Sequence, residues 1–335
     1  MTAEEAITPR HVLVLGGAGY IGSHAILALD AAGYRVSVLD NLSTGFRSAV
    51  PSHMDFHEGD ISDQALLQRL LKHRRYDAIM HFAASLIVPE SVLDPLKYYH
   101  NNTGKSIGVI AAAVDAGIPH IVFSSTAAVY GIPDRVPVAE TAPTRPINPY
   151  GASKLMIERI LADTALAHPV RFAALRYFNV AGADPLGRTG QSTPGATHLI
   201  KVVVEHLLDK RPAVDVFGSD FPTRDGTGVR DYIHVSDLAD LHVRALDHLL
   251  TGGENLIANC GYGHGFSVRE VIKAAERVSA RRAVINECPR RPGDPAELVA
   301  DASLIGRQFS WVPRFDDLET IIRHALRWEE KCIGM

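Results

Sequence analysis

Tyr150 and Lys154 stand four residues apart in the stretch YGASK, so a helix would place a phenol and an ammonium on one face. A tyrosine normally keeps its proton up to a pKa of about 10, and a nearby cation favours the phenolate. Lowering this pKa by about three units requires roughly 4 kcal/mol, and burial alone acts against it, so charges must dominate. We expect Tyr150 to remove a proton from a substrate hydroxyl while hydride leaves the same carbon.

Hydroxyl side chains precede this pair in the run Ser124-Ser125-Thr126, which follows an apolar stretch over residues 120–123. Thr126 stands 24 residues before Tyr150. We expect Thr126 to share the hydrogen bond of the substrate hydroxyl and to help pass its proton to Tyr150, with Ser124 and Ser125 as alternatives. A Tyr-x-x-x-Lys pair alone also occurs on exposed amphipathic helices, so the catalytic interpretation depends on a cofactor site elsewhere in the chain.

Residues 11–40 predict such a site. An apolar run over residues 12–15 fits a buried parallel strand, and the turn GGAGYIG follows it. A helical pattern then covers residues 20–32, and a second strand covers residues 35–39. Glycines let the backbone approach a pyrophosphate, and the N–H groups of the first helical turn face its charge. The residues expected to bind the dinucleotide here are Gly16, Gly19, Tyr20, Ile21 and Gly22.

The carboxylate of Asp40 follows the second strand, 18 residues after Gly22. At that place it accepts hydrogen bonds from the adenosine ribose, and it would repel a 2′-phosphate. We therefore expect NAD rather than NADP. The alternative is a tight strand–helix turn that binds no ligand. Asn41 begins a polar loop on the adenosine side of this site.

Asp60 and Ile61 follow a third strand, predicted over residues 54–57. In a nucleotide site, Asp60 would hold the adenine amino group and Ile61 would lie against the ring. Asp60 or Ser62 could instead cap the helix predicted over residues 62–73. The sequence leaves both interpretations open.

The alternation of strands and helices continues with strands over residues 76–82, 120–123 and 171–178 and long helices over residues 96–116 and 150–167. This pattern predicts an α/β fold with a doubly wound parallel (Rossmann-type) sheet, whose ligands bind at the carboxyl ends of the strands. From Asp184 the alternation fails, and glycine-rich loops predict a smaller C-terminal substrate-binding lobe. We assign residues 1–179 and about 231–262 to the NAD-binding domain, and residues 180–230 and 263–335 to the lobe. Further residues expected near the cofactor are Phe82, Ala83, Ala84, Asn101, Asn102 and Ser124.

Composition excludes several classes of protein. The chain of 335 residues is 46% hydrophobic and 21% charged, with a net charge of −4, which gives no electrostatic reason to expect nucleic acid or a membrane surface as partner. Its three cysteines are few and widely spaced, so we expect neither a disulfide framework nor a metal site. Residues 1–10 look like a poorly ordered lead-in without the apolar core of a secretory signal, and no apolar span is long enough for a membrane helix, so we expect a cytoplasmic protein.

Taken together, these segments resemble the extended short-chain dehydrogenase/reductases, and within them the UDP-glucose (UDP-galactose) 4-epimerases. The resemblance covers nearly the whole chain, and its last three segments are fairly specific to this subgroup. The resembling segments are GGAGYIGSH from Gly16, VLDNLS from Val38, FSSTAAVYG from Phe123, PYGASK from Pro149, RYFNVAGA from Arg176, DGTGVRDYIHVSDLA from Asp225 and RRPGD from Arg290.

The resemblance implies a UDP-sugar substrate and assigns roles to residues of the lobe. Arg230 and Arg291 would clamp the diphosphate with their planar guanidinium groups, unless they form ordinary salt bridges. Asp294 would meet the ribose hydroxyls, and Asn179 would bind the diphosphate or the sugar. The other residues implied are Tyr177 beside the nicotinamide, His198 and Leu199 at the nucleotide, and Leu298 at sugar C2.

Related enzyme classes differ at the residues after Thr126. The similar 4,6-dehydratases carry an Asp-Glu pair there, and the UDP-glucuronate decarboxylases carry a Glu, whereas this chain has Ala127-Ala128. The site therefore predicts oxidation and reduction only, as C4 epimerisation requires. The stretch Ser85-Leu86-Ile87 lacks a lysine that some relatives place near the pyrophosphate, which predicts weaker NAD retention.

Other functions remain open at this point. One alternative is an epimerase for a different UDP-sugar, because Leu298 is intermediate in size and leaves N-acetylated sugars possible. Two more are a net NAD-dependent nucleotide-sugar dehydrogenase or reductase and an NAD-sensing binding protein, although the second usually lacks the Tyr/Lys pair. The resemblance also implies a homodimer formed by the two long helices over residues 96–116 and 150–167.

Overall fold

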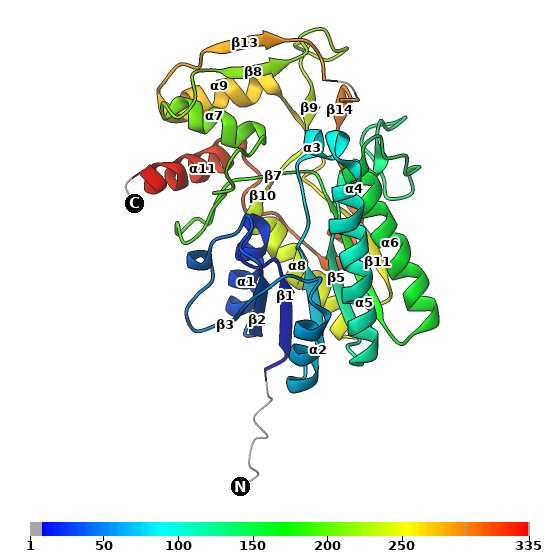
Figure 1. The fold of residues 1–335 in the computed structure, drawn as a ribbon. Helices are drawn as coiled ribbons and strands as arrows, with labels where there is room; N and C mark the ends of the chain where they lie inside the picture. Colours follow the sequence, from blue (N-terminus) through cyan, green and yellow to red (C-terminus); the bar gives the residue numbers. More distant parts are fainter. Residues whose placement is uncertain (1–8, 292, 334–335) are drawn as a thin grey trace.

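The structure is a computed structural model that describes residues 9–291 and 293–333, so most of the predicted lead-in lies outside the described residues. Seven parallel strands form the central sheet in the order β11-β6-β5-β4-β1-β2-β3 (Figure 1). This confirms the doubly wound parallel sheet. The strands are β1 (His11–Leu15), β2 (Arg35–Asp40), β3 (Asp55–Glu58), β4 (Ala78–His81), β5 (His120–Ser124), β6 (Arg171–Tyr177) and β11 (Leu256–Cys260).

The central strands of this sheet, such as β1 and β4, are buried on both faces because helices cover both, whereas the edge strand β3 is polar and only partly buried. In β1, Val12 and Val14 pack into one core cluster, whereas Leu13 and Leu15 pack into the other. This alternation is the side-chain period of a strand, and burial on both faces explains the continuous apolar run. The first face carries α1 (Tyr20–Ala31) and α8 (Val235–Leu250), and the second carries α2 (Gln64–His73), α5 (Lys105–Asp115) and α6 (Pro149–Ala167).

The predicted helix over residues 96–116 is divided in the structure. It consists of α4 (Pro95–Tyr98), a π-helical turn η2 (Tyr99–Gly104) and α5, and the short helix α3 (Val88–Leu93) before it was not predicted. The wide turn accompanies the buried amide of Asn102, which accepts a hydrogen bond from Ser85 N at 2.8 Å and donates one to Ser153 Oγ at 3.1 Å. The amide of Asn102 therefore joins the segment after β4 to α6, and its role toward the cofactor stays a prediction.

Asp63 caps helix α2, and its Oδ1 atom accepts a hydrogen bond from Leu66 N at 2.9 Å. The alternative in which Asp60 or Ser62 caps this helix is therefore wrong. Two short 3₁₀ turns, η1 (Arg47–Ala49) and η3 (Ala127–Tyr130), complete the elements around the sheet.

A smaller lobe lies above the carboxyl end of the sheet in Figure 1. Its core joins α7 (Leu199–Leu207), α9 (Val268–Ser279) and α11 (Leu318–Ile333) to the parallel pair β8 (Val214–Phe217) and β13 (Ile285–Cys288). The strands between the lobe and the sheet are β7 (Asn179–Ala181), β9 (Val229–Arg230), β10 (Tyr232–His234), β12 (Phe266–Ser267) and β14 (Glu297–Leu298).

Helix α10 (Ser303–Phe309) belongs to the predicted lobe segment, yet its Ile305 packs into the core cluster of the sheet. The division into two domains stays a prediction. None of the helices in the described ranges combines the length and apolar character that crossing a bilayer demands.

Candidate active site

The glycine-rich turn sits between the end of β1 and the start of α1, with Gly19 at the N-cap position. Gly16 has a φ of +80°, and a Cβ atom there would lie 2.6 Å from Ala83 N. A Cβ atom on Gly22 would lie 2.1 Å from Gly16 O. Larger residues would therefore push the turn apart, and the bare backbone leaves the first N–H groups of α1 accessible to a phosphate. This geometry fits the pyrophosphate of a dinucleotide. Tyr20 and Ile21, the first residues of α1, stand beside it.

The carboxylate of Asp40 lies at the end of β2, directly beside this turn. It accepts hydrogen bonds from Ala18 N at 2.9 Å and from Leu42 N at 2.8 Å. Burial raises the pKa of Asp40, and the two backbone N–H groups act in the opposite direction. The side chain is thereby fixed between the phosphate turn and the next loop, where an adenosine ribose would lie.

At the neighbouring strand end, Asp60 accepts hydrogen bonds from Asn41 Nδ2 at 2.7 Å and from Lys105 Nζ at 2.9 Å. Burial opposes ionisation of Asp60, but hydrogen bonds from Lys105, Ser62 and Asn41 outweigh it and lower the pKa of this carboxyl. The side chain of Ile61 is buried beside it. The structure thus brings Asn41 and Asp60 together at the carboxyl edge of the sheet, and their role toward adenine stays a prediction.

The predicted catalytic residues meet at the ends of β5 and α6. Asn148 caps α6 by accepting a hydrogen bond from Gly151 N at 2.8 Å, which sets Tyr150 in the first helical turn. Thr126 and Tyr177 lie close enough to the hydroxyl of Tyr150 to shift its pKa. Lys154 Nζ donates to the backbone oxygen of Ser124 at 2.9 Å. The phenol, the threonine and the ammonium therefore share one small region, as predicted.

Burial dominates the electrostatics of this region. It raises the pKa of Tyr150 well above the ordinary tyrosine value, and it lowers the pKa of Lys154 to about 7. Among the protein's own groups, burial outweighs the charges at Tyr150, and the expectation that the lysine and the nicotinamide together favour the phenolate stays a prediction. The hydrogen bond from Thr126 lowers the tyrosine pKa, but by less than burial raises it.

The remaining predicted cofactor residues line the same edge of the sheet. Ala83 and Ala84 follow β4, and Ala83 N donates to Leu15 O at 3.1 Å, so two strand ends lie close together. Asn101 Nδ2 donates to Ser85 Oγ at 3.0 Å. The ring of Phe82 lies 4.8 Å from the ring of His242. Apart from these contacts, Ser124 Oγ donates to Tyr177 Oη at 3.2 Å, which ties β5 to β6.

The two predicted arginines converge on one carboxylate in the lobe. Arg291 Nε lies 2.8 Å from Asp294 Oδ2, and Arg230 Nη2 lies 3.9 Å from Asp294 Oδ1. The cluster has one positive charge in excess, which suits a diphosphate. Both arginines form the ion pairs considered in the alternative, and these pairs leave guanidinium donors available. Phe217, which we did not predict, lies under Arg291 with its ring centre 4.9 Å from the guanidinium carbon.

Asn179 and Leu298 lie in strands that frame this cluster. Asn179 begins β7, and its backbone N–H donates to Asp231 O at 2.9 Å. Leu298 pairs with Arg230 in the β14–β9 ladder and is half-buried. The structure therefore brings Leu298 next to Arg230, a residue that we predict to bind the diphosphate.

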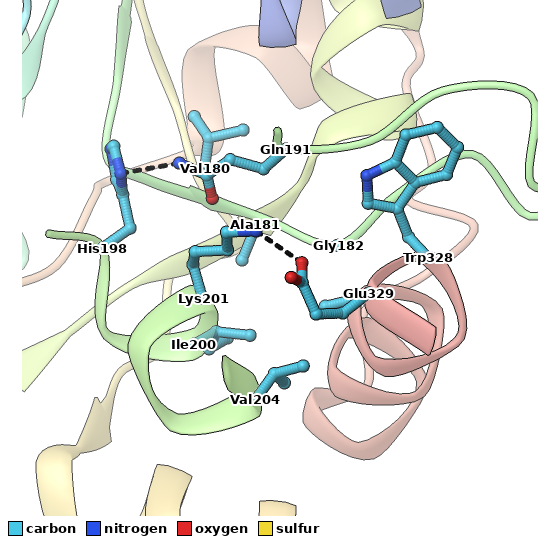
Figure 2. A pocket seen from close by; sticks show the side chains of 11 residues that line it. Val180, Ala181, Gly182, Gln191, His198, Ile200, Lys201, Val204, Trp328 and Glu329 are labelled. Carbon is cyan, nitrogen blue, oxygen red and sulfur yellow. Dashed lines mark hydrogen bonds and ion pairs between the residues drawn. The ribbon is translucent and has the colours of Figure 1, made fainter. Parts of the chain in front are cut away.

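His198 and Leu199 stand at the start of α7. The Nδ1 atom of His198 lies 2.8 Å from Gln191 Nε2, and burial lowers the pKa of this histidine (Figure 2). The cavity beside them has a volume of about 10 Å³, which is room for a single water molecule and too little for a hexose. It is lined by residues of β7, α7 and α11, and Figure 2 shows Trp328 at its edge.

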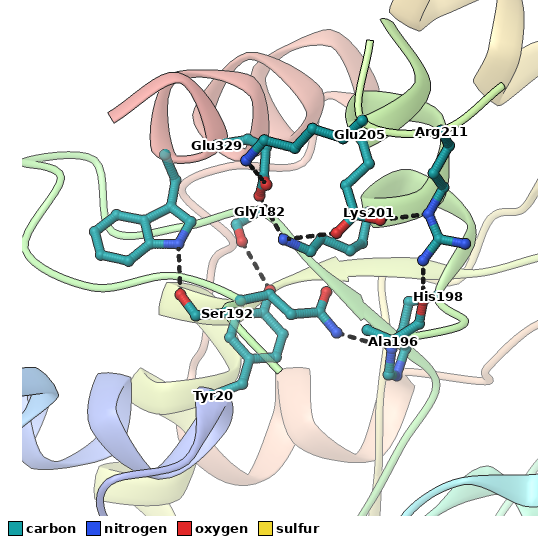
Figure 3. A network of polar contacts seen from close by, with 12 residues as sticks. Tyr20, Gly182, Ser192, Ala196, His198, Lys201, Glu205, Arg211 and Glu329 are labelled. Carbon is teal, nitrogen blue, oxygen red and sulfur yellow. Dashed lines mark hydrogen bonds and ion pairs between the residues drawn. The ribbon is translucent and has the colours of Figure 1, made fainter. Parts of the chain in front are cut away.

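Buried and partly buried ion pairs beside this cavity hold α7 in place (Figure 3). Lys201 contacts Glu329 of α11 and lies 3.2 Å from Glu205. Arg211 pairs with Glu205 and donates to Ala196 O at 3.3 Å. These contacts fix the helix whose first turn carries the predicted nucleotide residues.

Sequence reasoning missed two buried charged residues behind the catalytic pair, Glu158 and Arg176. The signals were present, because Glu158 follows Lys154 by four residues and Arg176 interrupts an apolar strand. A cation within a buried strand requires a partner, and a carboxylate one helical turn beyond the lysine is a suitable one.

The fold and the site are those of a dinucleotide-dependent enzyme. Comparison with known proteins assigns the chain to such a family. The model of the NAD dependent epimerase/dehydratase family matches residues 12–261, and the chain belongs to this family. This finding confirms the predicted NAD cofactor.

Individual relatives narrow the class further. A UDP-glucose 4-epimerase of Azospirillum brasilense is 57% identical over 337 residues, which cover 100% of this chain and 97% of the relative. The crystal structure of UDP-glucose 4-epimerase from Brucella ovis in complex with NAD is 45% identical with a TM-score of 0.92, covering 95% of this chain and 98% of that one. The enzyme from Bifidobacterium longum in complex with NAD+ and UDP is 37% identical with a TM-score of 0.91, covering 96% and 98%. The resemblance to the 4-epimerases is thereby confirmed.

Proposed function

We propose that this chain catalyses the reversible epimerisation of UDP-galactose and UDP-glucose at C4. The observation that carries the proposal is the position of the Tyr150 hydroxyl, within reach of Thr126 and one helical turn from Lys154, at the sheet edge that bears the glycine turn. Ala127 and Ala128 follow Thr126, so the two positions at which the similar 4,6-dehydratases carry an Asp-Glu pair hold no carboxylic acid that could eliminate water.

In this mechanism Tyr150 takes the proton of the 4-hydroxyl, and Thr126 shares the hydrogen bond of that hydroxyl. NAD held at the glycine turn would supply the acceptor for the hydride of C4 and, once reduced, the donor that restores it. Lys154 holds positive charge near the phenol, which favours the phenolate against burial. The residues named above at the turn, at Asp40 and at the strand ends hold the dinucleotide.

The lobe must grip the nucleotide and leave the hexose free to turn over. Arg230 and Arg291 bind the diphosphate, and Asp294 exchanges part of its contact with Arg291 for the ribose hydroxyls. Asn179, His198, Leu199 and Leu298 complete the UDP-sugar site. No charged residue is assigned to the hexose, which is what a rotating intermediate requires.

Net NADH formation separates this proposal from the alternative of a dehydrogenase. An epimerase regenerates NAD+ in each cycle, so conversion of UDP-galactose leaves the NADH content unchanged. A stoichiometric rise of NADH absorbance with turnover would contradict epimerisation and favour the dehydrogenase.

We also propose a cytoplasmic homodimer. The outer surface of α5 and α6, which lie side by side in Figure 1, exposes apolar side chains that solvent does not favour. Ile107 is 50% exposed, Met156 45% and Leu166 88%. A second copy of this chain would cover them in a four-helix arrangement. The free cysteines Cys260, Cys288 and Cys332 suit a reducing compartment.

A further inference from the structure

A buried ion pair lies directly behind the catalytic residues. Arg176 of β6 donates from Nε to Glu158 Oε1 at 3.0 Å and from Nη2 to Glu158 Oε2 at 2.6 Å. The glutamate is 2% exposed and the arginine 5%. A bidentate pair of this kind fixes the orientation of both side chains, and losing either partner would leave a buried charge uncompensated.

The pair connects the elements that carry the catalytic groups. Ser125, between Ser124 and Thr126, donates its hydroxyl to Glu158. Because Glu158 is on α6, this contact joins the end of β5 to the helix of Tyr150 and Lys154. The remaining donor of Arg176, Nη1, lies 3.0 Å from the hydroxyl of Tyr130, which in turn donates to Asn259 Oδ1 at 2.7 Å.

The surroundings of Lys154 leave its charge dependent on Glu158. Its Nζ atom contacts the backbone of Ser124 and lies 4.9 Å from the ring centre of Phe123. From β4, His81 faces the site as a neutral ring, because burial and the charge of Lys154 lower its pKa to about 3. Burial lowers the pKa of Lys154, and among the described residues Glu158 is the carboxylate whose charge raises it.

We propose that Glu158 and Arg176 are positioning residues of the epimerase, which hold the Ser124–Thr126 segment against α6 and keep Lys154 charged through the carboxylate of Glu158. This inference rests on the proposed function and extends it. The carboxylate is buried, and its oxygens accept hydrogen bonds from Arg176 and Ser125. It acts on the reaction through the lysine and through Ser125.

The test compares pH profiles of kcat and KM for the NAD-loaded wild-type protein and its variants. In Glu158→Gln, the amide keeps the size of the side chain and loses its charge. Lys154 then gives up its proton at lower pH, so the alkaline limb of the kcat profile moves down by about one pH unit, a tenfold loss on that limb. KM and NAD content stay within about twofold, because both members of the pair are buried and bonded to protein groups. An unmoved limb would overturn the proposal.

Two further variants separate charge from packing. Glu158→Asp keeps the charge, and we expect its limb to return toward the wild-type position. Arg176→Gln removes the positive partner, and its limb moves to higher pH, because the free carboxylate of Glu158 then acts on Lys154 alone. This variant carries the test if Glu158→Gln does not fold. A shift of the Arg176→Gln limb to lower pH would show a general loss of packing and would contradict the proposal.

A measurement that does not depend on turnover tests the role of Glu158 and Arg176 separately from the proposed epimerase activity. The ultraviolet absorbance of tyrosinate, measured as the difference between each protein and its Tyr150→Phe counterpart, reports the ionisation of Tyr150. In the NAD-loaded proteins, where the positive charge of the nicotinamide favours the phenolate, we expect this ionisation at higher pH in Glu158→Gln than in wild type. An inactive wild-type protein would contradict the proposed function, whereas identical tyrosinate titrations would contradict the role of the pair.

Discussion

Lys154 Nζ lies 2.9 Å from the backbone oxygen of Ser124 and so fastens helix α6 to the end of strand β5. This contact brings the first turn of α6, with Tyr150, to the threonine that ends the strand segment. The ammonium is almost entirely buried, and that burial opposes the charge that catalysis uses. The charge of this lysine therefore lowers the stability of the fold while it serves the reaction, and the loss of stability can be measured.

Lys154→Met should stabilise the protein while it abolishes activity. The folded-state pKa of Lys154 is about 7 and the unfolded value is about 10.4, so the folded state binds fewer protons between these values. The cost of the buried charge is therefore complete below about pH 7 and disappears as the pH rises toward 10.4. Losing the hydrogen bond to Ser124 offsets part of the gain, and we expect about 2–3 kcal/mol at neutral pH.

Denaturant unfolding at several pH values measures this effect. The exposed Lys72 of α2 provides the control, and Lys72→Met should change stability by less than about 0.5 kcal/mol. A Lys154→Met protein that is less stable than wild type at neutral pH would contradict the account.

Tyr150→Phe should lower kcat by about 10²–10⁴-fold, because the variant lacks the group that takes the hydroxyl proton. NAD content should stay close to wild type, since the ring and helix remain in place. Steady-state turnover and the absorbance of released NAD measure both quantities. Near-normal turnover would remove Tyr150 from the mechanism.

Gly22→Ala should reduce bound NAD by at least about tenfold. A Cβ atom at this position would lie 2.1 Å from the backbone oxygen of Gly16, so the turn must open and its N–H groups lose their alignment. Gly306→Ala in α10 is a matched control, because its Cβ atom meets nothing within 4 Å. The control should keep its NAD and gain about 0.5–1 kcal/mol of stability. Equal NAD content in both variants would contradict a phosphate site at the turn.

Light scattering tests the proposed dimer. The double variant Ile107→Glu/Met156→Glu places like charges on the outer surface of α5 and α6, and we expect it to be a monomer where wild type is a dimer. Val312 is 76% exposed in a loop away from these helices, so Val312→Glu should stay dimeric. A wild-type monomer, or a dimer that survives the double variant, would exclude this interface.

Short patterns in the sequence predicted much of the fold. The strand β1, the glycine turn and Asp40 were predictable because each has a strong short-range signal: an apolar run, a glycine spacing and an acid after the next strand. The meeting of Thr126 and Tyr150 was predictable because Thr126 follows a strand, Tyr150 lies at the start of the next long helix, and both places are at the carboxyl end of the sheet.

Other features depend on contacts between distant segments and were not predictable. The π-helical turn at Asn102 depends on the hydrogen bonds of this side chain to Ser85 and Ser153, and no periodicity in the sequence predicts such a turn. The raised pKa of Tyr150 depends on how completely the fold encloses it. Glu158 and Arg176 could each be noticed in the sequence, but their pairing required the register between α6 and β6.

The central claim is epimerisation at C4 with NAD retained through each cycle. The most direct measurement adds purified protein to UDP-galactose without any added cofactor and follows the sugar anomeric protons by NMR. We predict conversion to a mixture of UDP-glucose and UDP-galactose. Conversion only after NAD is added would preserve the reaction and point to weaker retention at Leu86, where a lysine is missing. No conversion, even with added NAD, would contradict the assignment to these two sugars.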